Sequence, residues 1–75
     1  MSEASAFDPA ALVRHLDELG LTLRCVRNPS GALAFAPWHG AGGDEAQRVL
    51  LDACQTSANR VALLAYLDAT GRYSS

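Results

Sequence analysis

Four side chains in the sequence belong to the types that most often bind metal ions, namely His15, Cys25, His39 and Cys54. Zinc sites usually draw on close ligand pairs such as Cys-x-x-Cys, because one short loop can then supply two ligands. No such pair occurs in this sequence, so we expect no metal site. We interpret both cysteines as small, reduced core residues, because a disulfide would require the segments that carry them to pack together.

The groups needed for nucleophilic catalysis are scattered along the chain. A serine or cysteine nucleophile needs a base and an orienting group beside it, whereas the carboxylates fall on the surfaces of the expected helices. These carboxylates are Asp17, Glu18, Asp44, Glu45, Asp52 and Asp68. A chain of 75 residues also leaves little room for a pocket of about 300 Å³. We therefore predict that the protein is not an enzyme and uses no cofactor.

A glycine-rich stretch at residues 39–43 follows an expected strand and precedes an expected helix, as phosphate-binding loops do. However, Asp44 and Glu45 occupy the positions where a phosphate would bind, and they would repel it. The chain also contains no lysine. We interpret residues 37–43 as a flexible connection.

The composition restricts the class of partner. Six arginines stand against 8 acidic residues, the net charge is −2, and 49% of the residues are hydrophobic. Nucleic-acid-binding proteins usually show a clear basic excess, so nucleic acid is a disfavoured partner. The sequence shows no secretory signal pattern and no apolar run near the ~20 residues of a membrane span. We expect a cytoplasmic protein.

The first helix is predicted from its two ends. Asp8-Pro9 is typical of a helix start, because the carboxylate accepts bonds from free N–H groups and proline suits the first turn. Leucines at helical spacing extend the helix over residues 9–19. Gly20 is typical of a helix end, because glycine readily adopts the left-handed conformation found there.

A β-hairpin is predicted next. Apolar and polar residues alternate over 21–26, an Asn-Pro-Ser-Gly turn occupies 28–31, and an apolar run follows at 32–36. Asp44 is predicted to cap a helical region over residues 45–70. The apolar stripe of this region is interrupted at residues 55–57. The interruption favours two helices, and one bent helix is the alternative.

The predicted fold is therefore α+β, a single αββαα domain with a two-stranded antiparallel hairpin packed on three helices. We expect order over about residues 8–70 and flexible tails at 1–7 and 72–75.

Several motifs in this order carry a family resemblance. They are Val13-Arg14-His15-Leu16 before Gly20, Leu21-Thr22-Leu23, Gly31-Ala32-Leu33-Ala34-Phe35 before a proline, and Val61-Ala62-Leu63-Leu64-Ala65-Tyr66-Leu67. Over roughly residues 9–68 the chain resembles the N-terminal docking domain of non-ribosomal peptide synthetases of the tubulysin type (TubC-like docking domain). The resemblance implies an αββαα fold, a homodimer, and a hairpin that receives a short segment from an upstream subunit.

On that resemblance, the partner-binding positions are those on the open face or edge of the hairpin and just after it. They are Thr22, Arg24, Val26, Arg27, Ala34 and Trp38, with Ala32 and Ala36 on the same face. The two arginines suit an acidic peptide. Trp38 has two interpretations that the sequence leaves open: it caps the core beneath the loop, or it is an exposed anchor for a partner.

The last helix carries more apolar residues than one core stripe needs. A stripe of Val61, Leu64 and Leu67 suffices for the core, which leaves Leu63 and Tyr66, and Leu51 on the helix before. Leu51, Leu63 and Tyr66 predict a helix-to-helix homodimer interface, because spare apolar patches commonly mark interaction sites. The alternative is that a bend at residues 56–57 turns both stripes into the core.

The leading hypothesis is a non-catalytic docking or adaptor domain that binds a short, acidic peptide of another protein on its hairpin. One alternative is a free-standing regulatory or inhibitory protein of a phage or mobile element that binds a larger protein complex. Another is a nucleic-acid-binding accessory protein, in which Arg24 and Arg27 contact phosphates while Phe35 and Trp38 stack on bases.

Overall fold

The computed structural model describes residues 7–38 and 42–74 of the chain. Its elements follow the order α1 (Pro9–Leu19), β1 (Cys25–Arg27), β2 (Leu33–Phe35), α2 (Gly43–Ala53) and α3 (Ser57–Ala69). The strands form one two-stranded antiparallel sheet. The predicted α+β class and αββαα order are confirmed, and the helical region after the hairpin consists of two helices.

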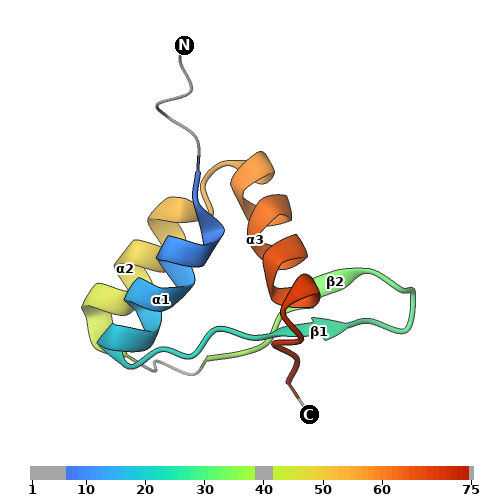
Figure 1. The fold of residues 1–75 in the computed structure, drawn as a ribbon, viewed down its shortest axis with the longest axis horizontal. Helices are drawn as coiled ribbons and strands as arrows, with labels where there is room; N and C mark the ends of the chain where they lie inside the picture. Colours follow the sequence, from blue (N-terminus) through green and yellow to red (C-terminus); the bar gives the residue numbers. More distant parts are fainter. Residues whose placement is uncertain (1–6, 39–41, 75) are drawn as a thin grey trace.

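The three helices stand side by side above the hairpin (Figure 1). Helix α1 contacts both α2 and α3, and α3 contacts both strands. The core between these elements consists of Val13, Leu16, Leu21, Leu23, Cys25, Ala36, Ala46, Leu50, Leu63 and Leu67. Within the described residues, no helix has the length and apolar character needed to cross a membrane.

Both ends of α1 are formed as the sequence predicts. The Asp8 carboxylate accepts hydrogen bonds from the backbone N–H groups of Ala10 and Ala11, at 3.1 and 3.2 Å. At the other end, Gly20 adopts a φ of 97°, and the N–H groups of Gly20 and Leu21 donate to carbonyls of the last helical turn. This closure directs Leu21 into the core and fixes where the chain leaves the helix.

The hairpin follows the predicted turn, but its ladder is shorter than the alternating pattern. The N–H of Gly31 donates to the carbonyl of Asn28 at 2.8 Å, and Gly31 has a φ of 93°. Leu21, Leu23 and Cys25 are buried, as the alternation predicts. Nevertheless only three residues on each side form regular strand, with Val26 opposite Ala34 at the centre of the ladder.

Helix α2 begins earlier than predicted, and its cap is Gly42 rather than Asp44. Gly42 has a φ of 76°, and a Cβ added there would lie 2.5 Å from Ala46 Cβ and 3.0 Å from Leu21 Cβ. The start of α2 is thus fixed by close packing against the end of α1. Asp44 instead lies in the first turn, where its negative charge faces the positive end of the helix dipole.

The apolar stripe of α3 is phased differently from the prediction. Leu63 is 0% exposed, whereas Val61, which was expected in the core, is 67% exposed. The assignment of Leu63 to a dimer surface is therefore wrong, because the break before α3 turns Leu63 and Leu67 toward α1 and the hairpin. Leu51 is 57% exposed and Tyr66 is half-buried. A helix-mediated homodimer stays a prediction.

Residues 72–74 are paired with the sheet, in contrast to the flexible tail expected there. The N–H of Cys25 donates to the carbonyl of Arg72, and the N–H of Ser74 donates to the carbonyl of Cys25, both at 2.9 Å. Tyr73 forms a parallel bridge with Cys25. The outer edge of β1 is therefore covered at Cys25 by the chain itself.

The packing at Gly42 predicts a difference between two neighbouring glycines. Gly42→Ala should lower the free energy of unfolding by roughly 3 kcal/mol, since it adds overpacking to the strain of a positive φ. Gly43 also has a positive φ, but a Cβ there meets nothing within 4 Å. Gly43→Ala should therefore cost only about 1 kcal/mol. Urea unfolding measures both values, and equal losses would contradict the close approach.

The phase of α3 predicts a second contrast. Leu63→Ala should lower the free energy of unfolding by about 2–5 kcal/mol, because it leaves a cavity in the core. Val61→Ala, on the exposed side of the same helix, should change it by less than about 0.5 kcal/mol. Thermal or urea unfolding tests the pair, and a larger loss at Val61 would restore the stripe expected from the sequence.

Candidate peptide-binding groove at the base of the hairpin

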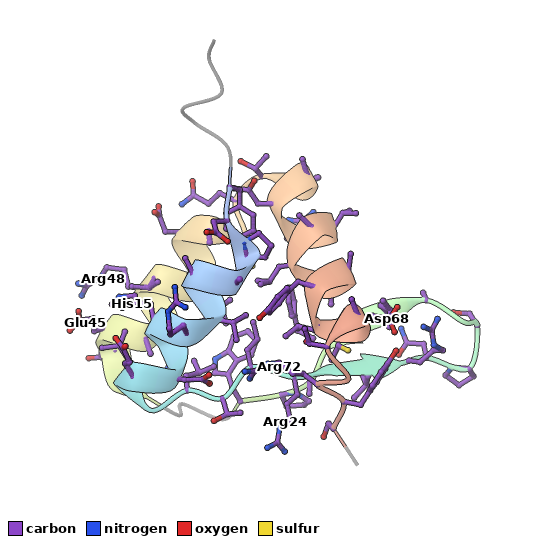
Figure 2. The ribbon with its side chains drawn as sticks, viewed as in Figure 1. His15, Arg24, Glu45, Arg48, Asp68 and Arg72 are labelled. Atoms are coloured by element: carbon purple, nitrogen blue, oxygen red, sulfur yellow. The ribbon has the colours of Figure 1, made fainter. Side chains whose placement is uncertain are left out.

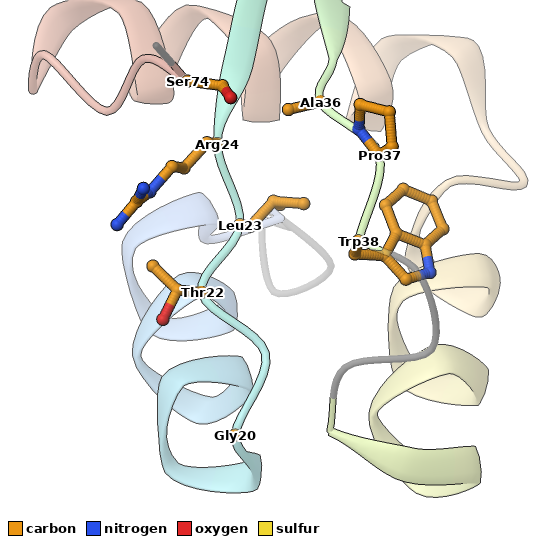
Figure 3. A pocket seen from close by; sticks show the side chains of 8 residues that line it. All are labelled: Gly20, Thr22, Leu23, Arg24, Ala36, Pro37, Trp38 and Ser74. Atoms are coloured by element: carbon orange, nitrogen blue, oxygen red, sulfur yellow. The ribbon is translucent and has the colours of Figure 1, made fainter.

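An open groove lies where the two strands of the hairpin separate (Figure 3). The last hydrogen bond across the strands runs from the N–H of Ala36 to the carbonyl of Arg24, at 2.9 Å, and none between described residues joins 20–23 to 37–38. The groove has a volume of about 340 Å³ and is lined by Gly20, Thr22, Leu23, Arg24, Ala36, Pro37, Trp38 and Ser74. The expectation that so short a chain leaves little room for a pocket of about 300 Å³ is wrong.

Unequal chain lengths account for the groove. The two segments meet at one end through the Arg24–Ala36 bond and at the other through Gly20 and Gly42, where a Cβ on Gly20 would lie 3.5 Å from Gly42 Cα. In the sequence, three residues (21–23) separate these two points on one segment, and five residues (37–41) separate them on the other. Because the two stretches differ in length, they cannot continue a regular ladder. The buried Leu23 side chain closes the floor.

Three of the predicted partner-binding residues line this groove. Thr22 and Arg24 are exposed on one wall, and Trp38 belongs to the other. Trp38 is half-buried and packs against the core cluster while it also lines the groove. Both interpretations of Trp38 thus describe part of its position.

The remaining predicted residues lie farther along the hairpin. Val26 and Ala34 face each other in the ladder and are half-buried. Arg27 is held within the chain, since it donates to the carbonyl of Gly31 at 2.7 Å and forms an ion pair with Asp68 at 3.5 Å.

Ala36 corrects the face that was expected to be open. It is only 6% exposed, and its methyl group points toward the neighbouring segment, across the floor of the groove. Ala36 was expected on the open face together with Ala32 and Ala34, and it is instead buried beside the last hydrogen bond of the ladder.

The electrostatic character of the groove is set by Arg24. Its side chain forms no ion pair or hydrogen bond with another described residue, and it extends into solvent (Figure 2). The other polar side chains lining the groove are the hydroxyls of Thr22 and Ser74 and the indole of Trp38. Among the described residues that line the groove, none carries a carboxylate, an imidazole or a thiol.

The residues considered for metal binding are placed apart. Among residues 7–38 and 42–74, no three His, Cys, Asp or Glu side chains come close enough to hold a metal ion, and His39 lies outside these ranges. Cys25 is buried and Cys54 is half-buried, both as free thiols. Burial raises the pKa of both, and the nearby Asp68 carboxylate raises the pKa of Cys25 further, whereas Arg60 acts in the opposite direction at Cys54.

Sequence patterns gave no indication of Gly20, Pro37 or Ser74 as lining residues. Gly20 and Pro37 were interpreted only as ends of elements, and Ser74 as part of a loose tail. The Gly-Arg-Tyr-Ser stretch has no periodicity that predicts strand pairing. Only the three-dimensional return of the chain to β1 brings Ser74 beside Arg24 (Figure 3).

No protein-family model matches the chain, and neither the curated proteins nor the solved structures searched give a match. The resemblance to TubC-like docking domains therefore stays a prediction.

The two thiols should differ in reactivity and in their effect on stability. Cys25 should react with a disulfide reagent much more slowly than Cys54, because it is buried and its thiolate is disfavoured. The variants Cys54→Ala and Cys25→Ala isolate each rate.

The pKa of Cys25 in the folded chain lies above its ordinary value of 9.0, so the unfolded chain loses this proton first. The free energy of unfolding should therefore fall as the pH rises above about 9, less steeply in Cys25→Ala.

Proposed function

We propose that the protein is a non-catalytic docking or adaptor domain whose groove binds a short, acidic segment of another protein. The observation that carries this proposal is an open groove lined by Arg24 on one segment and by Trp38 on the other (Figure 3); the Arg24 guanidinium extends outward into solvent and has no ion-pair partner among the described residues. Free thiols at Cys25 and Cys54 are compatible with action in the cytoplasm, where thiols stay reduced.

Each wall of the groove offers a different contact. Among described residues, the segments 21–24 and 36–38 make no backbone hydrogen bond to each other beyond the one from Ala36 to Arg24, so an extended peptide can bond to the backbone between them. Trp38 supplies an apolar anchor of the kind enriched at binding hot spots. Arg24 supplies a cation that pairs with a carboxylate in a bidentate manner. A groove of about 340 Å³ contacts only a few peptide residues, which favours weak, transient binding.

The preference for an acidic partner rests on which arginines are free. Arg27 pairs with Asp68 and Arg72 pairs with Asp17, whereas Arg24 has no such partner among the described residues. A nucleic-acid partner is less well supported, because one free arginine in the groove neutralises only one phosphate.

Binding to synthetic peptides tests the proposal. Short extended peptides with acidic, neutral or basic residues at each position are compared by fluorescence anisotropy. The chain should prefer acidic peptides, and Arg24→Glu should weaken their binding at least about tenfold, because a charge-assisted hydrogen bond is replaced by repulsion.

Arg48→Glu is the matched control, since Arg48 lies exposed on α2, away from the groove, and carries the same change of net charge. It should leave the affinity almost unchanged. An equal loss in both variants, or a preference for basic peptides, would refute an acid-binding groove at Arg24.

A further inference from the structure

Residues Arg72–Ser74, here called the strap, occupy the position of a third strand. They lie on the edge of β1 that faces away from β2 (Figure 1). The strap is joined to Cys25 by two backbone hydrogen bonds of 2.9 Å, one to its N–H and one to its carbonyl. It therefore satisfies both backbone groups of a fully buried residue.

Two side chains of the strap are recognised by charged groups on other elements. The guanidinium of Arg72 lies 3.4 Å from the carboxylate of Asp17 on α1. The hydroxyl of Tyr73 donates to the carboxylate of Asp68 on α3 and lies 3.4 Å from the guanidinium of Arg27. Beside the edge of β1, Asp17 thus forms a binding position for a cation. Asp68 and Arg27 form a second, polar position for the hydroxyl of a tyrosine.

The attachment of the strap is weak compared with the core. Its ion pair is about one-third exposed on each side, and Tyr73 is 38% exposed. Exposed ion pairs contribute little to stability, and such peripheral segments open without unfolding of the whole domain. The preceding Gly71 has a φ of 72° and open space around it, so it can act as the hinge.

A segment that takes the place of the strap at the edge of β1 must have a defined chemistry. Without the strap, the N–H and carbonyl of Cys25 are unpaired at a strand edge, which is a template for another extended chain. A replacement that uses all the available contacts runs parallel to β1 at this point. It carries a basic residue for Asp17, followed directly by a tyrosine for Asp68 and Arg27.

We propose that the outer edge of β1 is a second binding site, which accepts an extended segment of another protein carrying an Arg-Tyr pair. The strap is its resident occupant in the isolated chain and competes with the incoming segment. Because the strap is tethered, its effective concentration is in the millimolar range or above, so an isolated peptide displaces it poorly. This proposal does not rest on the groove at Arg24, which selects the opposite charge, although Ser74 belongs to both sites.

The test uses the full-length chain with a weakened strap. In Arg72→Ala/Tyr73→Ala, the backbone amide of Cys25 should exchange with solvent roughly tenfold faster than in the parent chain. The amide of Val26, which pairs with β2, is the internal control and should keep its rate. Ser74→Pro removes one strap hydrogen bond without changing any charge, and it should shift Cys25 in the same direction.

The probe is the blocked synthetic peptide Gly-Arg-Tyr-Ser-Ser, added to the double variant at millimolar concentration. It should restore the protection of the Cys25 amide, whereas Gly-Glu-Phe-Ser-Ser should not. In the same background, Asp17→Asn should lower the affinity for the probe peptide severalfold, and Arg24→Ala should leave this affinity unchanged. Unaltered exchange at Cys25, equal binding of both peptides, or loss of binding in Arg24→Ala would each overturn the proposal.

Discussion

The contact between Gly20 and Gly42 is the constraint on which the rest of the structure depends. It brings the end of α1 against the start of α2, and at Gly42 the neighbouring Ala46, Leu21 and Leu19 leave no space for even a methyl group. Both glycines also adopt positive φ angles, so the turn out of one helix and the turn into the next are made without strain. The chain between Gly20 and Gly42 must therefore leave the pair of helices α1 and α2 and return to the same place.

The groove is a consequence of this closure. Since the hairpin begins and ends at one point of the helix pair, its two legs must be of equal length to form a continuous ladder. They are not equal, because five residues of the sequence (37–41) separate Ala36 from Gly42, whereas three (21–23) separate Gly20 from Arg24. Pairing is therefore limited to the outer part of the hairpin, and an open space remains between Arg24 and Trp38. The groove thus arises because the two segments differ in length, and the contact between Gly20 and Gly42 prevents them from shifting to remove this difference.

Local signals in the sequence were sufficient for the elements but not for their contacts. Asp8, Gly20 and Gly31 act through backbone groups within a few residues, so their effects were predictable. The start of α2 was misplaced because the Gly42 packing depends on residues of α1 that are distant in sequence. The α3 stripe was misphased because that helix is apolar on several sides, so periodicity could not distinguish Leu63 from Val61. Strand alternation placed Arg24 opposite the buried face, and its binding role came from the family resemblance, whereas the strap depends on the return of the chain to β1.

The two proposed sites are coupled through Ser74. This residue belongs to the strap and also lines the groove beside Arg24. Under the two proposals, an acidic segment that contacts the Ser74 hydroxyl would hold the strap against β1, and a segment that displaces the strap would remove Ser74 from the groove lining. Linkage requires the effect to be reciprocal, so each ligand lowers the affinity for the other by the same factor. Although the net charge of the chain is only −2, the two proposals place a position that binds acidic groups at Arg24 and a position that binds basic groups at the outer edge of β1.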